Sequence, residues 1–188
     1  MRVLLIGAPG AGKGTQGERV AEHFGLTHIS SGDLLRQHVA VGTAIGRAVQ
    51  DYVRRGDLVP DAIIVDMLRK PVVAATESGG YVLDGFPRTV EQAETAYSTA
   101  RDLGVEVQVA VHLEVPTEVL VRRLLARGRG TDDTQETIEH RLAVYRERTL
   151  PMLDYYASRE KLVVVNGSRP VPEVTWSIVV QLEQALAH

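Results

Sequence analysis

A glycine-rich segment carrying a lysine and a hydroxyl directly follows the first apolar run of the chain. After Arg2 to Ile6 the sequence reads Gly-Ala-Pro-Gly-Ala-Gly-Lys-Gly-Thr, from Gly7 to Thr15. Glycines permit positive φ and close backbone approach, so successive N–H groups can surround phosphate oxygens while a lysine adds positive charge. A strict phosphate loop has Ser or Thr directly after the lysine, and here one glycine intervenes. A tight turn with chance glycines is the alternative, but we expect phosphate contacts from Gly10, Ala11, Gly12, Lys13, Gly14 and Thr15.

Two arginines and two aspartates follow other apolar runs. Arg36 and Arg88 each come shortly after a glycine and an aspartate, Asp33 and Asp84 respectively. A guanidinium can engage two phosphate oxygens at once and keeps its charge, although surface ion pairs would also use these arginines. A carboxylate at the end of a strand can orient Mg²⁺, partly through water, or can cap the next turn. We therefore expect a phosphate and Mg²⁺ near Asp84, with Asp33 assisting.

A further group of arginines lies around residues 123 to 129. Arg123 and Arg127 are four residues apart, so they share one helix face, and Arg129 follows in a polar stretch. Cations are favourable at the carboxyl end of a helix, and the spacing alone therefore favours a solvated helix end.

Apolar strands alternate with helical segments along most of the chain. A mostly parallel sheet covered on both faces is expected, with ligands beyond the carboxyl ends of its strands. The expected strands are 2–6, 27–30, 81–83, a run within 105–113, and 162–165; the expected helices are 13–24, 33–41, 43–55, 60–75, 89–103, 116–126, a long helix broken near Pro151, and one containing Trp176.

Composition sets limits on the class of protein. The 188 residues suit one domain, and the absence of cysteine excludes disulfides and thiolate chemistry and is compatible with the cytoplasm. The six histidines form no close cluster with acids, and a net charge of −3 argues against nucleic-acid binding by bulk electrostatics. The segment from Met1 to Ile6 is too short for a signal peptide or membrane span.

Three motifs taken together resemble the nucleoside monophosphate kinases, adenylate kinase in particular. They are Gly7 to Gln16, Ile29 to Arg36, and Asp84 to Arg88, and they occur in the family's order. The resemblance implies an α/β phosphate-loop fold of three layers, with a five-stranded parallel sheet in the order 2-3-1-4-5. It also implies one domain, 1–188, with a core of 1–29, 60–125 and 136–188, a helical monophosphate-binding insertion at 30–59, and a short lid at 126–135 without zinc.

The resemblance also implies roles for individual residues. Arg123 would stabilise transition-state charge, Arg127 would meet ATP, Arg129 and Arg141 would act mainly on AMP and the transferred group, and Gly167 would approach the ATP adenine. Keeping Asp132 and Asp133 in the family pattern shifts Arg129 by one position, and Gly167 could instead form a simple turn. The implied AMP site comprises Ser31, Arg36, Asp57, Leu58, Val59, Gly85, Phe86, Pro87, Arg88, Gln92, Arg129 and Arg141.

The implied activity is reversible transfer of the terminal phosphoryl group of ATP to AMP, giving two ADP and maintaining the adenine nucleotide balance. A cytoplasmic monomer that uses Mg²⁺ is expected, with ATP and AMP as partners and with neither nucleic acid nor membrane. A GTPase switch is disfavoured because Asn166 is the only asparagine, so an Asn-Lys-x-Asp guanine motif cannot exist. A UMP/CMP kinase and a catalytically inactive nucleotide-binding protein remain the alternatives.

Overall fold

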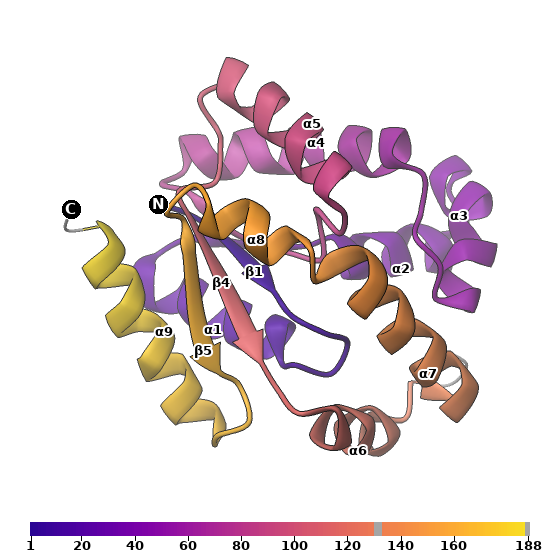
Figure 1. Ribbon diagram of the computed structural model, residues 1–188. Coiled ribbons are helices and arrows are strands. Elements are labelled where there is room, and N and C mark those ends of the chain that lie inside the picture. The colour runs from indigo at the N-terminus through magenta and orange to yellow at the C-terminus, as the bar shows by residue number, and fades with distance from the viewer. Residues whose placement is uncertain (130–132, 187–188) are drawn as a thin grey trace.

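Five parallel strands form one sheet at the centre of the protein, as the computed structural model shows for residues 1–129 and 133–186 (Figure 1). The strand order is β2-β3-β1-β4-β5, which confirms the predicted fold class and order. The strands are β1 (Arg2–Ile6), β2 (Thr27–Ser30), β3 (Tyr81–Asp84), β4 (Val109–Glu114) and β5 (Leu162–Asn166). The fourth strand is shorter than the apolar run from 105 suggested, because the run includes the connection that leads into it.

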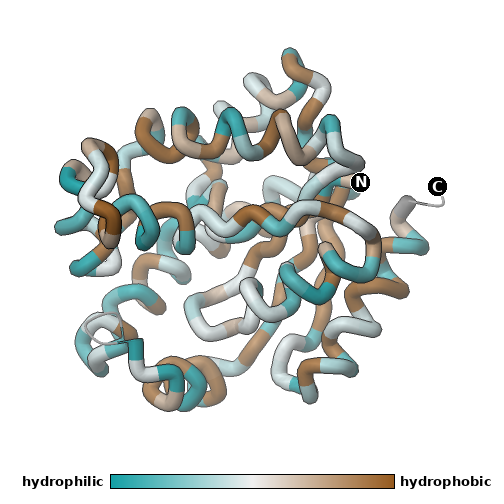
Figure 2. The backbone as a smooth tube through the Cα atoms, turned by 180° about the vertical axis from the view of Figure 1, so that it is seen from behind, coloured by the Kyte–Doolittle hydropathy of each residue, from teal (hydrophilic) through white to brown (hydrophobic). Residues whose placement is uncertain are grey.

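Alternate residues of β1 feed two separate cores. Val3 and Leu5 belong to a core on one face of the sheet, whereas Leu4 and Ile6 belong to a core on the other. This is the period-two alternation of a strand whose faces are both covered. In Figure 2 the strands appear as brown, hydrophobic segments in the middle of the molecule.

Helices cover both faces of the sheet. The core of Val3 includes side chains of α1 (Lys13–Phe24), α6 (Thr117–Arg127), α7 (Gln135–Val144) and α9 (Val171–Leu186). The core of Leu4 includes side chains of α2 (Ser31–Val41), α3 (Ala44–Arg55), α4 (Asp61–Glu77), α5 (Val90–Asp102) and α8 (Met152–Ala157). No helix of the described residues is long and apolar enough to cross a membrane.

The two consecutive helices α2 and α3 pack closely against each other. A Cβ on Gly46 would lie 2.0 Å from the carbonyl oxygen of His38, so only glycine permits this approach.

The prediction that α2 begins at Asp33 is wrong by two residues, because Ser30 is the N-cap and its Oγ accepts a hydrogen bond from the Asp33 N–H at 3.3 Å. The helix pair lies beside the sheet rather than over its centre (Figure 1).

The expected break near Pro151 takes the form of a π-helical turn. Residues Tyr145–Thr149 form this turn between α7 and α8, and Leu150 separates it from the proline. Such turns widen a helix locally and are frequent at functional sites. Tyr145 and Thr149 both face the cleft described next.

Candidate active site

The phosphate loop lies between β1 and the amino end of α1, at the carboxyl edge of the sheet. Gly10 and Gly12 have φ of 84° and 96°, which side chains rarely adopt. A Cβ on Gly10 would also lie 2.9 Å from Cγ of Leu124 in α6. Gly12 is the N-cap of α1 and provides no side-chain hydrogen bond, so N–H groups of the first turn are available to a ligand. The loop has the form of an anion site.

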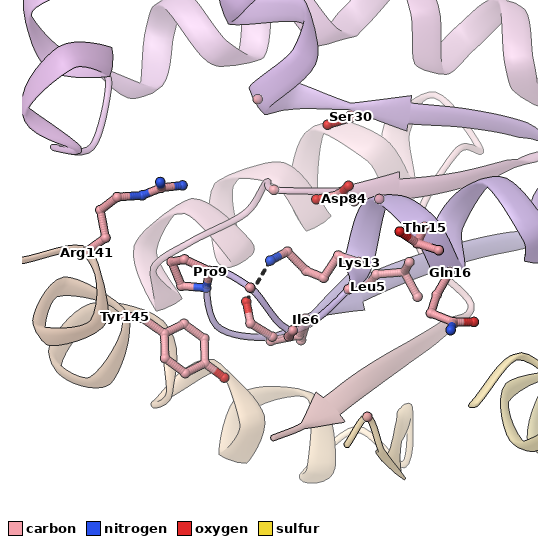
Figure 3. Close-up of a pocket in the computed structure, with 18 of the residues that line it drawn as sticks. Leu5, Ile6, Pro9, Lys13, Thr15, Gln16, Ser30, Asp84, Arg141 and Tyr145 are labelled. Atoms are coloured by element: carbon pink, nitrogen blue, oxygen red, sulfur yellow. Dashed lines mark hydrogen bonds between the residues drawn. The ribbon is translucent and has the colours of Figure 1, made fainter. Parts of the chain in front are cut away.

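Lys13 turns back across this loop. Its Nζ donates hydrogen bonds to the carbonyl oxygens of Gly7 at 2.9 Å and Ala8 at 3.2 Å, and Figure 3 shows the side chain crossing the loop. Burial lowers the pKa of the Lys13 ammonium to about 8. The positive charge is therefore held in a poorly hydrated position, where an incoming phosphate would find it weakly screened.

Asp84 lies at the end of β3 and faces the same space as Lys13 (Figure 3). It is buried, and its Oδ2 is 3.5 Å from Nε2 of His28. Burial opposes ionisation of Asp84, but His28, Lys13 and Arg88 together outweigh it and hold the pKa of the carboxyl below its usual value. Asp84 is therefore an anion at neutral pH. Asp33 also lines the cleft, and its carboxylate pairs with the guanidinium of Arg36.

Arg88 follows the loop after β3 and is held by hydrogen bonds to Gly85 and Thr149. Its Nε donates to the carbonyl oxygen of Gly85 at 2.7 Å, and its carbonyl oxygen accepts from Oγ1 of Thr149 at 2.8 Å. The peptide bond between Phe86 and Pro87 is cis. The two hydrogen bonds hold Arg88 in the wall of the cleft. Arg36, from α2, lines the same cleft.

Three arginines lie around the buried carboxylate of Asp133: Arg127 at the end of α6, Arg129 directly after that helix, and Arg141 of α7. Arg127 donates from Nε to Oδ2 of Asp133 at 2.8 Å and from Nη2 to Oδ1, and the backbone N–H of Arg129 donates to Oδ2 at 2.9 Å. Nη1 of Arg141 lies 3.8 Å from Oδ1. The hydrogen bonds from Arg127 lower the pKa of the Asp133 carboxyl. Asp132, which the sequence paired with Asp133, lies outside the described residues.

A smaller cavity of ≈ 60 Å³ adjoins the main cleft. Ser31 lies in its wall, and its Oγ is buried without a hydrogen-bond partner among the described residues. Gln92 is also buried and has both ends of its amide engaged by Arg88 and Asp61. Asp57 lines the cavity, and its carboxylate lies 2.8 Å from Nε2 of His140 and 3.0 Å from Nε of Arg55, so its side chain is already engaged. A buried hydroxyl without a partner is costly unless a ligand completes it.

The structure brings all of the predicted site residues together around these two cavities. The main cleft has a volume of ≈ 450 Å³. It is lined by Gly10, Ala11, Gly12, Lys13, Gly14, Thr15, Asp33, Arg36, Asp84, Pro87, Arg88, Arg123, Arg127, Arg129, Arg141 and Gly167. The smaller cavity is lined by Ser31, Arg36, Asp57, Leu58, Val59, Gly85, Phe86, Arg88, Gln92 and Arg141.

Sequence reasoning did not single out several residues of the main cleft. Tyr145, Thr149 and Arg169 also line it. Arg169 follows Gly167 at the end of β5, and its position after a strand could have indicated it. Tyr145 and Thr149 could not be found this way, because the π-helical turn that directs both of them inward leaves no clear mark in the sequence.

The parallel sheet, the phosphate loop and the arginines facing it define a phosphate-loop nucleotide-binding protein of the α/β class. The family model described as adenylate kinase matches residues 5–161. An adenylate kinase of Trichodesmium erythraeum is 40% identical over 98% of this chain and 98% of its own length. An adenylate kinase of Thermobifida fusca is 44% identical over 93% of this chain and 94% of its own, and one of Leptospira biflexa is 43% identical over 95% and 97%.

The chain belongs to the adenylate kinase family. It is a phosphotransferase that passes the terminal phosphoryl group of ATP to AMP.

Proposed function

We propose that the two joined cavities divide the substrates between them, with the phosphates of ATP in the main cleft and the AMP base in the smaller cavity. The observation that carries this division is the set of residues that line both cavities. Arg36, Arg88 and Arg141 are shared, so three guanidinium groups stand between the donor and acceptor sides. That arrangement suits a reaction between two anionic phosphates.

We propose the following roles for the residues that line the two cavities. The phosphate loop and Lys13 hold the outer phosphates of ATP, while Arg36 and Arg88 hold the AMP phosphate in line with the γ-phosphorus. Arg123, Arg127, Arg129 and Arg141 spread positive charge over the transferring group. No covalent intermediate is needed, because positioning and electrostatic stabilisation supply the catalysis. Gly167 lines the main cleft, a Cβ there would meet Val115 at 2.8 Å, and its backbone would border the ATP adenine.

Magnesium is the proposed cofactor, and no zinc is proposed. Asp84 supplies a buried anionic carboxylate, and Asp33 supplies an exposed one in the same cleft. The described residues hold no group of three or more histidine, cysteine or acidic side chains suited to a metal. This donor set fits Mg²⁺, which keeps several waters and is bound through one or two carboxylates and the substrate phosphates. When bound, the ion would neutralise charge on the ATP phosphates.

The proposal includes motion of the acceptor-binding residues 30–59 and of the lid 126–135 against a core of the remaining residues; residues 130–132 of this lid lie outside the described residues. Closure of both would exclude water and assemble the arginines only when both substrates are bound. We further propose that the protein acts as a monomer in the cytoplasm.

Steady-state transfer from ATP to AMP, UMP, CMP and GMP, each with and without Mg²⁺, tests the proposal. Turnover that depends on Mg²⁺ and is confined to AMP supports both the base site and the cofactor. Preference for UMP or CMP would keep the phosphate site and overturn the base site. Absence of turnover with any acceptor, together with thermal stabilisation by ATP and AMP, would leave nucleotide binding without catalysis.

A further inference from the structure

The side-chain amide of Gln92 is held at both ends by protein groups: the backbone of Arg88 and the carboxylate of Asp61, which does not line the cavity. Its Oε1 accepts a hydrogen bond from the backbone N–H of Arg88 at 2.7 Å. Its Nε2 donates to Oδ1 of Asp61 at 2.6 Å. Gln92 is 4% exposed, so little water reaches its amide, whereas Asp61 is exposed at the start of α4.

These two partners allow only one orientation of the amide. A backbone N–H can only donate, and an ionised carboxylate can only accept. Rotation of the amide by 180° would place Nε2 against the Arg88 N–H and Oε1 against the Asp61 carboxylate, so both hydrogen bonds would become repulsive contacts. Asp61 is the first residue of α4, where the helix dipole favours its negative charge.

The fixed orientation decides what Gln92 can offer to a base. After both hydrogen bonds are made, the amide retains one N–H donor and one oxygen lone pair. A 6-aminopurine presents an amino donor next to the N1 acceptor, whereas a 6-oxopurine presents a carbonyl acceptor next to an N1–H donor. At a given position of the base, an amide that matches one purine must therefore rotate to match the other.

We propose that Asp61 is a positioning residue that holds the Gln92 amide in the orientation suited to AMP and thereby selects AMP over 6-oxopurine monophosphates. The inference rests on the proposed function, since it requires that Gln92 meets the AMP base in the smaller cavity. Asp61 itself lines neither of the two cavities. The charge-assisted hydrogen bond to Gln92 is the means by which it acts.

The test compares AMP with IMP, which differ at the 6-position and N1 and share the phosphate and ribose. Asp61→Asn keeps the shape of the side chain, but its amide can present either a donor or an acceptor to Gln92. We expect the ratio of kcat/KM for AMP to that for IMP to fall by about tenfold, corresponding to the loss of one charge-assisted hydrogen bond. The change should fall mainly in KM for the monophosphate. Asp66→Asn, an exposed charge change on the same helix, should leave the ratio as in the wild type.

A double-mutant cycle separates a positioning role from a purely structural one. Gln92→Met removes the amide while approximately preserving its volume, and Asp61→Asn should have no further effect on the AMP to IMP ratio in that background. If Gln92→Met lowers the AMP to IMP ratio but Asp61→Asn alone leaves it unchanged, the role of Asp61 is overturned and the proposed base site stands. A ratio that Gln92→Met leaves unchanged would instead overturn the base site on which the inference depends.

Discussion

Asp133 lies beneath Arg127 and accepts hydrogen bonds from its guanidinium through both carboxylate oxygens. The Asp133 side chain has no exposed surface, whereas that of Arg127 is 31% exposed. Arg127 is therefore held by a buried carboxylate and still lines the cleft. The Arg129 N–H adds a third hydrogen bond to the same carboxylate. One buried aspartate thus positions the segment that enters the proposed lid.

Replacing Asp133 with asparagine should therefore slow the chemical step. The amide can accept at one end only, so Arg127 loses one of its two hydrogen bonds and its fixed direction. We expect kcat to fall by about ten- to a hundredfold, because small displacements of catalytic groups have effects of this size. Steady-state rates at saturating ATP and AMP measure the effect, with the exposed Asp102→Asn as the control. A kcat within twofold of the wild type would contradict this role of Asp133.

Lys13 should be required for catalysis. Lys13→Met keeps an unbranched side chain and removes the positive charge that we place against the outer phosphates of ATP. We expect kcat to fall more than about a hundredfold, by comparison with the effect of a single arginine on phosphoryl transfer. Arg88→Ala should have a loss of similar size. Activity of either variant within tenfold of the wild type would show that its charge does not act on the transferred group.

The same lysine should make the free protein more stable as the pH rises above 8. Burial lowers the pKa of Lys13 from 10.5 to about 8. Between these values the unfolded chain binds a proton that the folded chain lacks, so the free energy of unfolding increases with pH. The wild type should gain about 3 kcal/mol relative to Lys13→Met across this interval. Urea unfolding of both proteins at pH 7.5 and pH 10 measures the difference. If the free energy of unfolding changes equally with pH in the wild type and in Lys13→Met, folding does not lower the pKa of Lys13.

The parts of the site that local sequence determines were predictable, and those that depend on distant contacts were not. The phosphate loop follows from a run of glycines next to an apolar strand, and the strand order follows from the family resemblance that this loop supports. The link between Gln92 and Asp61 joins residues 31 positions apart, and nothing in either segment indicates it. The start of α2 at Ser31 depended on which hydroxyl caps the helix, which is a choice between neighbouring residues.

Ser31 should contribute to the choice of monophosphate. Its Oγ is buried and has no hydrogen-bond partner among the described residues, which leaves it free to meet a base. Ser31→Ala removes that hydroxyl with little change in volume. We expect weaker discrimination of AMP from UMP and CMP, by about three- to tenfold in relative kcat/KM, in line with the loss of one neutral hydrogen bond. Unchanged relative kcat/KM for the three acceptors would remove Ser31 from the base site.

His112 connects the sheet to the π-helical turn. Its Nε2 lies 3.1 Å from Oη of Tyr145, and Tyr145 is one helical turn beyond Arg141 (Figure 3). Burial lowers the pKa of His112 below its ordinary value of 6.5; Glu114 opposes this effect and Lys13 adds to it. His112 is therefore neutral at pH 7, and its hydrogen bond helps to fix the helix that carries Arg141 into the cleft.

Acid should consequently destabilise the wild type more than a variant with a non-titrating side chain at this position. As the pH falls below 6.5, the unfolded chain takes up a proton on His112 before the folded chain does, so stability is lost. His112→Gln can retain the hydrogen bond to Tyr145 without titrating, and its Tm should fall less than that of the wild type between pH 7 and pH 5. Tyr145→Phe, which removes the hydrogen bond, should cost about 1 kcal/mol at pH 7 and keep the acid sensitivity. An equal fall in Tm for wild type and His112→Gln would exclude His112 as the source of the acid sensitivity.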